Sequence, residues 1–499
     1  MTTLHSSLPL LSSATAPPSS GGRTGPPGQG IVHLGLGNFH RAHQAVYTEA
    51  ALAREDGDWG ILGVASRSAT VANALRAQDL RYSVAEISPQ GSTYSVPSVH
   101  TDAIVAAREP DRVVSAIADP STKIVSLTVT ENGYTYSPAT KGLHLDHPDI
   151  VHDLAGGVPR STIGLIARGL QGRIGHSSPV SVLSCDNLNT NGEHTRRLVL
   201  EFAQNLPSAE AVELAAWIEE NVAFPSTMVD RIVPATTDSH RSNSARDMGF
   251  VDSVPVAAEP FSMWILEDTF AAGRPVWEAG GAIFSDQVDR YEQLKVRLLN
   301  GTHSLIAYLG ALSGATTIPE SVSRHFVERA AREILQGEYL PSVDVPDEID
   351  PAVYEEQLFV RWSNTALGHR TQQVGSDGSV KLRERIPEPA VLFRDSGRVP
   401  HLMALTVAAY LCCLAPMDGF DPGPHASAMQ DPARAWLSKL AARAASGTEL
   451  ATWAISDRRL LGDDLAEWDG FVERTGELID IIVRHGVEAA TADAMEGAR

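Results

Sequence analysis

A lysine, an asparagine and a histidine lie close together in residues 295–304 (KVRLLNGTHS). Lysine can exchange a proton with a hydroxyl group, and asparagine and histidine can hydrogen-bond an alcohol or carbonyl oxygen. On an ideal α-helix at about 100° per residue, Lys295 lies about 80° from His303 but about 140° from Asn300. Lys295 and Asn300 can therefore converge only through the long lysine stem or through a helix irregularity at Gly301.

Glu292 lies one helical turn before Lys295 and could hold or relay its proton. An exposed lysine titrates near about 10.4, so a lysine that acts as a base needs burial or nearby cations to lower its pKa. Taken alone, the segment is also explained by a surface lysine, a helix interrupted by glycine and a core histidine. The chemistry therefore depends on what other segments contribute.

Two glycines, Gly35 and Gly37, follow a short apolar run and precede a segment with a helical pattern. At such a strand-to-helix turn, glycines let the backbone approach a dinucleotide pyrophosphate, and the helix N-terminus offers free N–H groups. The third glycine of the usual pattern is replaced by His40, and an ordinary loop is the alternative interpretation.

The second predicted strand ends near Arg67 and has no acidic residue there. An acidic residue at this place would bind the ribose of NAD, whereas an arginine accommodates the additional phosphate of NADP. Arg67 could equally be a solvated surface residue, so this segment leaves the coenzyme open.

Small polar residues follow another buried strand, in residues 184–192 (SCDNLNTNG). Ligands bind at the carboxyl ends of strands in open α/β sheets, so these side chains, Asn191 among them, could orient a polyhydroxyl compound or donate to its carbonyl oxygen. An asparagine-rich turn and helix cap explains them as well. Asp230 and Arg231 are similarly ambiguous, with a buried structural ion pair as the default interpretation.

The elements that would position these residues follow from hydrophobic patterning. Four buried strands are predicted, at residues 31–36, 60–65, 123–130 and 179–184. Helical patterns separate them, which predicts a parallel sheet with crossover helices. From about residue 291 onward the chain has long amphipathic stretches, at 294–312, 320–335, 401–414 and 431–445. We therefore predict an α/β domain over residues 30–287 and a mostly α-helical substrate and catalytic domain over residues 288–499.

Length and composition agree with an enzyme of this size. One hydrophobic core usually stops growing at about 250–300 residues, so a chain of 499 residues should form at least two domains. Hydrophobic residues make up 43% of the chain and charged residues 20%, as in ordinary globular proteins. The net charge of −21 argues against nucleic-acid binding, because no basic surface is available for the phosphates.

Only three cysteines occur, Cys185, Cys412 and Cys413, which is neither a disulfide framework nor a metal-ligand spacing and suits a reducing compartment. No apolar run is long enough for a transmembrane helix. Residues 1–29 are rich in Ser, Pro, Gly and Thr and predict a disordered tail without a secretory signal. We expect a cytoplasmic protein, monomeric or a small homo-oligomer, that binds no metal, nucleic acid or membrane.

Five segments together resemble the mannitol dehydrogenase family, the polyol-specific long-chain dehydrogenases that also include fructuronate reductase. The segments are residues 31–47 (IVHLGLGNFHRAHQAVY), 127–134 (LTVTENGY), 184–192 (SCDNLNTNG), 224–234 (FPSTMVDRIVP) and 295–304 (KVRLLNGTHS). They occur in the family's order, and the resemblance spans about residues 30–490. It implies a Rossmann-like N-terminal domain, a helical C-terminal domain, substrate between them and catalysis without a metal.

The resemblance also implies roles for individual residues. Lys295 falls at the family's catalytic lysine, with Glu292 as the acid beside it. Asn191 and Asn300 fall where asparagines polarise the reacting oxygen, and His303 and Asp230 match substrate-site positions. The nucleotide-binding turn corresponds to Gly35, Gly37, Asn38, Phe39, His40 and Arg41.

These roles predict the NAD(P)-dependent interconversion of a sugar alcohol and its ketose, with D-mannitol and D-fructose as the first expectation. Residues 361–381 are more similar to the uronate reductases, and Arg370 or Lys381 could pair with a carboxylate or phosphate of the substrate. Reduction of fructuronate or tagaturonate and oxidation of mannitol 1-phosphate are therefore alternatives.

NAD is the expected coenzyme. NADP stays open, because Ser68 and Ala69 stand where NAD-preferring members of the family often have acidic residues. The alternative from a different functional class is a sensor that binds a nucleotide without turnover. The combination of Lys295, Asn191, Asn300 and His303 speaks against such a sensor.

Overall fold

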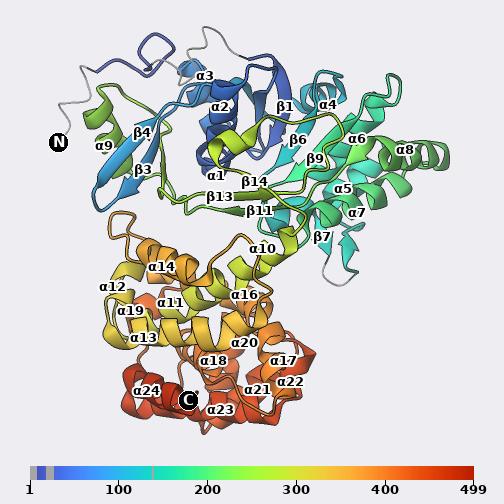
Figure 1. The fold of residues 1–499 in the computed structure, drawn as a ribbon. Helices are drawn as coiled ribbons and strands as arrows, with labels where there is room; N and C mark the ends of the chain where they lie inside the picture. Colours follow the sequence, from blue (N-terminus) through green and yellow to red (C-terminus); the bar gives the residue numbers. More distant parts are fainter. Residues whose placement is uncertain (1–7, 18–26, 138–139, 499) are drawn as a thin grey trace. The chain divides into compact units, whose positions relative to one another are not determined.

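The computed structural model describes residues 8–17, 27–137 and 140–498. The chain divides into two compact units, Met1–Asp289 and Arg290–Arg499 (Figure 1). The predicted domain boundary, between residues 287 and 288, falls just before this division. Each unit is described by itself below.

The first unit contains a six-stranded parallel sheet. Its strands, in spatial order, are β10 (Val222–Ala223), β9 (Val180–Ser184), β6 (Ile124–Leu127), β1 (Gln29–Leu34), β2 (Gly60–Ala65) and β5 (His100–Val105). The order turns outward in both directions from β1, which is the arrangement of a doubly wound dinucleotide-binding sheet. The predicted Rossmann-like α/β fold is confirmed, and β2 has the predicted bounds.

Alternation along the strands builds two cores, one on each face of this sheet. Val32 and Val64 pack into one core, with helices α4, α6, α7 and α8, whereas their neighbours Ile31 and Ala65 pack into the other. Successive side chains of a strand point to opposite faces, so a parallel strand that is covered on both sides must be apolar throughout. For this reason the four strands predicted from the sequence are mostly apolar.

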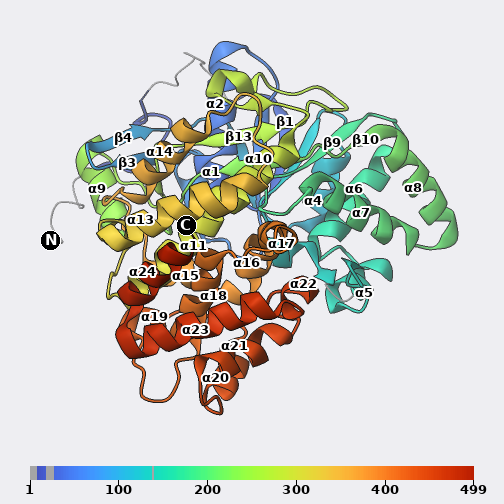
Figure 2. The same cartoon turned by 60° about the horizontal axis from the view of Figure 1, so that its bottom comes forward.

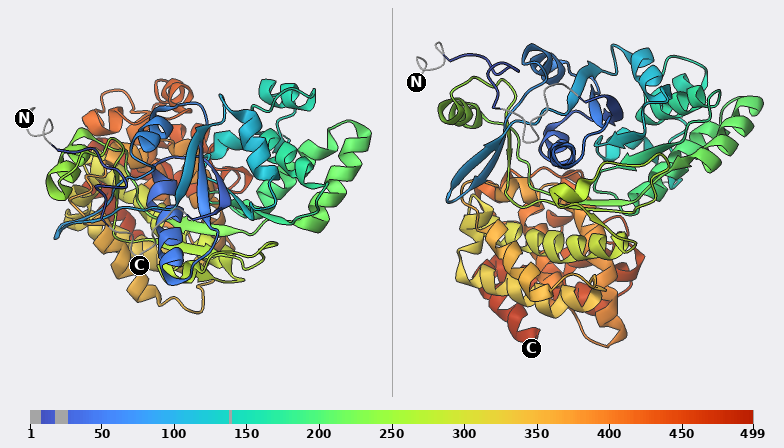
Figure 3. Two further views of the ribbon diagram at one scale, coloured as in Figure 1. Left: turned by 90° about the horizontal axis from the view of Figure 1, so that it is seen from above. Right: turned by 45° about the horizontal axis from the view of Figure 1, so that its top comes forward.

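The helices of the first unit are α1 (Asn38–Ala42), α2 (Gln44–Arg54), α3 (Thr70–Ala77), α4 (Pro110–Ala118), α5 (Pro148–Leu154), α6 (Thr162–Arg173), α7 (Asn191–Gln204), α8 (Ser208–Asn221) and α9 (Asp238–Met248), with short 3₁₀ turns at Glu131–Tyr134 and Trp277–Gly280. Helices α7 and α8 lie beside the β9 and β10 edge of the sheet (Figure 3). Three small sheets complete the unit: β12 (Val256–Ala258) with β3 (Val84–Ser88) and β4 (Gly91–Ser95), β11 (Thr227–Asp230) with β13 (Met263–Leu266) and β14 (Ile283–Phe284), and β7 (Tyr136–Ser137) with β8 (Gly142–Leu143).

Part of the predicted disordered tail packs against the first unit. Leu11 is fully buried, and its N–H donates to the carbonyl of Val251 at 2.8 Å. The Ser13 hydroxyl donates to the Asp79 carboxylate at 2.8 Å. The prediction of disorder is therefore wrong for residues 8–17, because one apolar side chain and these bonds hold them in place. Residues 1–7 and 18–26 of the predicted tail lie outside the described residues.

The second unit is built of helices, as predicted. These are α10 (Val288–Leu294), α11 (Thr302–Leu312), α12 (Ile318–Val322), α13 (His325–Glu333), α14 (Pro351–Trp362), α15 (Thr371–Gly375), α16 (Gly378–Arg385), α17 (Pro387–Asp395), α18 (His401–Leu414), α19 (Gly423–Ser427), α20 (Arg434–Ala441), α21 (Gly447–Ser456), α22 (Asp463–Ala466), α23 (Asp469–His485) and α24 (Val487–Gly497), with π-helical segments at Lys295–Gly301 and Ile334–Tyr339 and a 3₁₀ turn at Leu340–Ser342.

Helices α11 and α18 form the centre of the second unit. Both are apolar on every side and almost completely buried, as expected for helices surrounded by others. Helix α18 packs against α11 and α23, and α23 also packs against α21 and α24 (Figure 2). The three cysteines are free thiols and are buried, Cys185 in the first unit and Cys412 and Cys413 in α18.

No helix within the described residues is both long enough and apolar enough to cross a membrane.

Candidate active site

The helix that carries Lys295 is irregular, and the irregularity is longer than the sequence suggested. A π-helical segment, Lys295–Gly301, joins α10 to α11. Its hydrogen bonds run between residues five positions apart, so such residues become neighbours along the helix. Lys295 and Asn300 are such a pair. In a π-helix, Lys295 and Asn300 lie on the same side of the helix, whereas a regular α-helix would separate them, and π-helices are frequent at functional sites.

Packing from other elements holds the π-helix in place. A Cβ atom on Gly301 would lie 2.4 Å from the Tyr339 ring, so only glycine allows this ring to approach. Arg385, at the end of α16, donates through Nη1 to the carbonyl of Asn300 at 3.0 Å and to the Ser304 hydroxyl at 2.7 Å. No local motif indicated Arg385, because it lies 85 residues from its partner Asn300.

The predicted acid/base residue is buried. Lys295 is 8% exposed, and Glu292 precedes it by one turn at the end of α10. Burial disfavours a charged ammonium group relative to a neutral amine. The predicted role of Lys295 as a proton acceptor stays a prediction.

His303 lies on the first turn of α11 and is 8% exposed. Its ring contacts the rings of His369 and Trp362, with centroid distances of 5.3 and 6.1 Å. Burial holds the pKa of His303 well below its usual value, and the neighbouring charges of His369, Arg385, Arg361 and Lys381 lower it further. His303 is therefore a neutral imidazole near several cationic groups.

Several buried polar atoms of this region have no hydrogen-bond partner among the described residues: His303 Nε2, Thr302 Oγ1, Tyr339 OH and Trp362 Nε1. A buried polar atom without a partner is unfavourable, and such atoms are uncommon in folded proteins. Polar groups of a bound ligand could satisfy those atoms that line a binding site.

Of the two predicted carboxylate ligands, Lys381 is among the charged groups that lower the pKa of His303. Lys381 Nζ donates to the carbonyl oxygens of Val374 and Ser376 at 3.3 and 2.6 Å, and its charge acts on His303. Arg370, the other one, is exposed and directly follows His369 in the chain. Arg361, on α14 and 7% exposed, also lowers the pKa of His303 through its charge.

In the first unit, the glycine turn follows β1. Gly35 has a φ of +113°, and a Cβ atom there would lie 2.1 Å from the carbonyl oxygen of Thr128. Only glycine fits this position. Gly37 is exposed and donates its N–H to the Gly35 carbonyl at 2.6 Å. Phe39 is partly exposed and stacks on the ring of His43 at 4.9 Å. Asn38 accepts a hydrogen bond from Arg41 Nη2 at 2.7 Å.

His40 and Arg41 are buried, and their predicted contact with the coenzyme stays a prediction. His40 is fully buried, stacks on His33 with ring centroids 3.5 Å apart, and hydrogen-bonds Gln44 and His100, each at 3.1 Å. Arg41 is 1% exposed and donates to the carbonyls of Val254 and Gly37. The hydrogen bonds of these two buried side chains stabilise the segment that follows the glycine turn.

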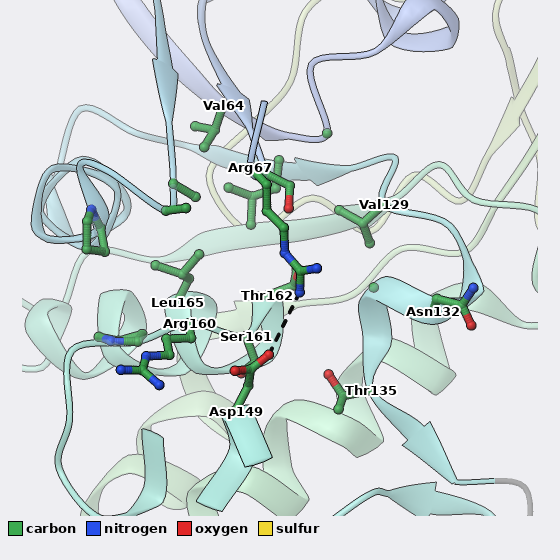
Figure 4. Close-up of a pocket in the computed structure, with 18 of the residues that line it drawn as sticks. Val64, Arg67, Val129, Asn132, Thr135, Asp149, Arg160, Ser161, Thr162 and Leu165 are labelled. Atoms are coloured by element: carbon green, nitrogen blue, oxygen red, sulfur yellow. Dashed lines mark ion pairs between the residues drawn. The ribbon is translucent and has the colours of Figure 1, made fainter. Parts of the chain in front are cut away.

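A cavity of about 640 Å³ opens beside the glycine turn (Figure 4). It is lined by residues from the ends of β1, β2, β5 and β6 and from the segment that joins α5 to α6. These include Gly35, Ser66, Arg67, Ala106, Ala107, Val129, Asn132, Asp149, Arg160 and Ser161. The carboxyl ends of these strands are where doubly wound sheets bind dinucleotides.

Asn191 is held by hydrogen bonds within the first unit. Its Nδ2 donates to the carbonyls of Asp186 and Thr227 at 3.1 and 2.9 Å, and its Oδ1 accepts from the Thr227 N–H at 3.0 Å. Both amide hydrogens are thus used within the protein, and the side chain is fully buried. Asn191 ties the start of α7 to β11, and its predicted role at the substrate oxygen stays a prediction.

Asp230 ends β11 and is 5% exposed. Its neighbour Arg231, which the sequence suggested as a partner, forms an ion pair with another carboxylate. Arg231 pairs with Glu86 at 2.6 Å and also donates to the carbonyls of Ala42 and Glu259. Its bonds join β11 to α1 and β3.

Two family models match the chain. The mannitol dehydrogenase Rossmann domain matches residues 29–279, and the mannitol dehydrogenase C-terminal domain matches residues 287–482. The chain belongs to the mannitol dehydrogenase family. The resemblance inferred from the five segments is confirmed, and the protein is an oxidoreductase of this family.

Individual members of the mannitol dehydrogenase family match over almost the whole chain. D-mannonate oxidoreductase of Escherichia coli is 38% identical, with 89% of this chain and 90% of the relative covered. Mannitol 2-dehydrogenase of Pyrenophora tritici-repentis is 36% identical, with 92% and 81% covered. The solved ternary complex of Pseudomonas fluorescens mannitol 2-dehydrogenase with NAD and D-mannitol is 31% identical, has a TM-score of 0.84, and covers 97% of this chain and 99% of its own.

Proposed function

We propose that the protein is an NAD-dependent oxidoreductase that interconverts a secondary alcohol of an open-chain polyhydroxy compound and the corresponding ketone. The observation that supports this proposal is the π-helix Lys295–Gly301, in which Lys295 and Asn300 are five residues apart and so lie on one side of the helix, about one turn before His303. A proton acceptor, an amide donor and a hydrogen-bonding imidazole are the groups that such a reaction needs.

The cavity of the first unit fits the coenzyme. Gly35 lines the cavity, which lies at the carboxyl ends of β1, β2, β5 and β6. The family relative from Pseudomonas fluorescens was solved with NAD. When bound, NAD supplies the nicotinamide ring that takes up or releases the hydride.

Each site residue of the second unit then has a defined task. Lys295 accepts the proton of the substrate hydroxyl during oxidation and returns it during reduction. The side-chain amide of Asn300 donates to the same oxygen as negative charge develops on it. His303, held neutral by burial, hydrogen-bonds a neighbouring hydroxyl group through its Nε2. Glu292 holds the proton that leaves Lys295.

The charges around His303 favour a sugar acid over a neutral polyol. Arg361, Lys381 and Arg385 all act on His303, and an arginine pairs well with a carboxylate. The relative from Escherichia coli that matches at 38% identity is named D-mannonate oxidoreductase. We therefore propose D-mannonate and D-fructuronate as the substrate pair, ahead of D-mannitol and D-fructose, which the family name first suggested.

Coenzyme oxidation by the purified protein tests both the proposed reaction and the proposed substrate pair. Fructuronate, tagaturonate, fructose and fructose 6-phosphate are each offered with NADH. We expect kcat/KM for fructuronate to exceed that for fructose by about tenfold or more, the scale of a charge-assisted hydrogen bond. Arg361→Gln should remove this preference and leave turnover of fructose nearly unchanged. A preference for fructose would return D-mannitol to first place, and no turnover of any compound would favour a nucleotide sensor.

A further inference from the structure

We propose that the cavity of the first unit also accepts a 2′-phosphorylated adenosine, so that the protein binds NADP(H) as well as NAD(H), and that Arg67 holds the 2′-phosphate. This inference rests on the proposed function only in so far as the cavity binds a dinucleotide. It assigns a specificity role to a residue that the catalytic site does not use.

Arg67 lies where a doubly wound sheet binds the adenosine ribose of a dinucleotide. Strand β2 ends at Ala65, and Ser66 and Arg67 line the cavity directly after it. In a doubly wound sheet, the residue after the second strand meets the adenosine ribose. A carboxylate there accepts from the 2′-hydroxyl and repels a 2′-phosphate, whereas an arginine accommodates the phosphate. Residues 66–69 (SRSA) contain no carboxylate.

The guanidinium of Arg67 can reorient toward a ligand. Its side chain is 85% exposed, and among the described residues its one ion pair is with Asp149, at 4.0 Å. Figure 4 shows the side chain extending across the cavity from the end of β2 toward Asp149 on α5. An exposed ion pair of this length contributes little, whereas an arginine can bind a phosphate through two parallel, charge-assisted hydrogen bonds.

The other charged groups of the cavity also favour an anion on balance. Arg160 is exposed and lines the cavity, and its guanidinium forms no ion pair with any described residue. His147 and His152 face the cavity as well, whereas Asp149 is the one carboxylate in its lining. Two arginines against one carboxylate leave a net positive charge where a dianionic phosphate would lie.

Coenzyme binding to the full chain, measured by the fluorescence of NADH and NADPH without substrate, tests the inference. We expect the Kd for NADPH to lie within about fivefold of that for NADH. Arg67→Ala should raise the Kd for NADPH by about tenfold or more, since a charge-assisted hydrogen bond is lost. The same variant should change the Kd for NADH by less than about threefold. Asp149→Asn should lower the Kd for NADPH, because it removes a negative charge that opposes the 2′-phosphate.

Two further measurements separate specificity from folding. Arg196→Ala removes an exposed arginine of α7 that pairs with Glu219 outside the cavity, and it should leave both affinities unchanged. Protection against thermal unfolding by 2′,5′-ADP, compared with 5′-ADP, should be lost selectively in Arg67→Ala. The inference is overturned if wild-type protein binds NADH but not NADPH, or if Arg67→Ala weakens both coenzymes equally. If neither coenzyme binds, the dinucleotide assignment itself fails, and this inference fails with it.

Discussion

Lys295 is the residue on which the proposed reaction depends most directly. We expect Lys295→Ala to lower kcat by about a hundredfold or more, the usual contribution of a general acid or base. Coenzyme binding should persist, because the cavity beside Gly35 belongs to the other unit. Steady-state kinetics together with coenzyme fluorescence measure the two effects, and Lys439→Ala, on exposed helix α20, is the matched control. Near-normal turnover would contradict the assignment.

Individual site residues were predictable where one motif contains them, and not where a distant partner decides their role. Lys295, Asn300 and His303 stand in one segment, and the structure keeps them on one helix. Asn191 was assigned a substrate role, but its partner Thr227 lies 36 residues further along the chain. Nothing local in the sequence indicates that this carboxamide is fully used within the fold.

Arg385 is a positioning residue for the π-helix, since it acts on Asn300 through the backbone. Arg385→Met should lower kcat for fructose by about tenfold while KM changes little, because the Asn300 donor is displaced without loss of a substrate contact. Arg385→Lys keeps one donor and should recover part of kcat. A purely structural role predicts instead that melting temperature and kcat fall together and that lysine gives no selective recovery.

At the scale of elements, the π-helix depends on Gly301. Gly301→Ala would place a Cβ atom 2.4 Å from the Tyr339 ring, and we expect a loss of about 1–3 kcal/mol in unfolding free energy, as for other overpacked sites. Denaturant unfolding measures this loss. Combination with Tyr339→Ala should relieve the clash. If the double variant is no more stable than expected from adding the two single effects, Tyr339 does not hold this turn.

The helix after the glycine turn depends on a buried histidine in place of the usual third glycine. His40→Gly removes the stacking on His33 and the hydrogen bonds to Gln44 and His100. We expect a loss of about 2–4 kcal/mol in stability from the cavity and the unpaired groups, and weaker NADH binding. Thermal unfolding and coenzyme titration check this. A glycine variant that binds NADH more tightly would show that His40 only fills a glycine position.

The elements themselves were predictable where patterning is strong. Strand β2 and helix α18 have the predicted bounds, because each is an uninterrupted apolar run. Strand β5 was not assigned, since His100–Val105 (HTDAIV) begins with polar residues and is completed only by pairing with β2. The π-helix could not be read from residue types, because the Tyr339 ring and the Arg385 guanidinium that hold it come from distant segments.

For the whole molecule, buried histidines predict a loss of stability in acid. Burial lowers the pKa of His33 and His100 to about 3 and that of His369 to about 4, and it also lowers the pKa of His40 and His303. In the unfolded chain these groups take up protons near about 6.5. Between these values the unfolded state binds more protons, so the stabilisation present above about pH 6.5 is lost as the pH falls.

One group acts in the opposite direction. Burial raises the pKa of Glu338 to about 7, although its carboxylate accepts from the N–H groups of Leu402 and Met403 at 2.8 and 2.7 Å. Its contribution is present at low pH and is lost as the pH rises through about 7. Five histidines outweigh one carboxyl group, so we expect the urea midpoint of unfolding to fall clearly from pH 7.5 to pH 5.0. An unchanged midpoint would contradict this.

Each unit contains at least one buried thiol whose chemical modification can report local unfolding of that unit. Cys185 is buried in the first unit, and Cys412 and Cys413 are buried in α18 of the second. A thiol reagent can modify them only when the surrounding structure opens, so their modification rates follow local or global unfolding. The natural sequence therefore allows the opening of the first unit and of the second unit to be timed separately, without introducing any new cysteine.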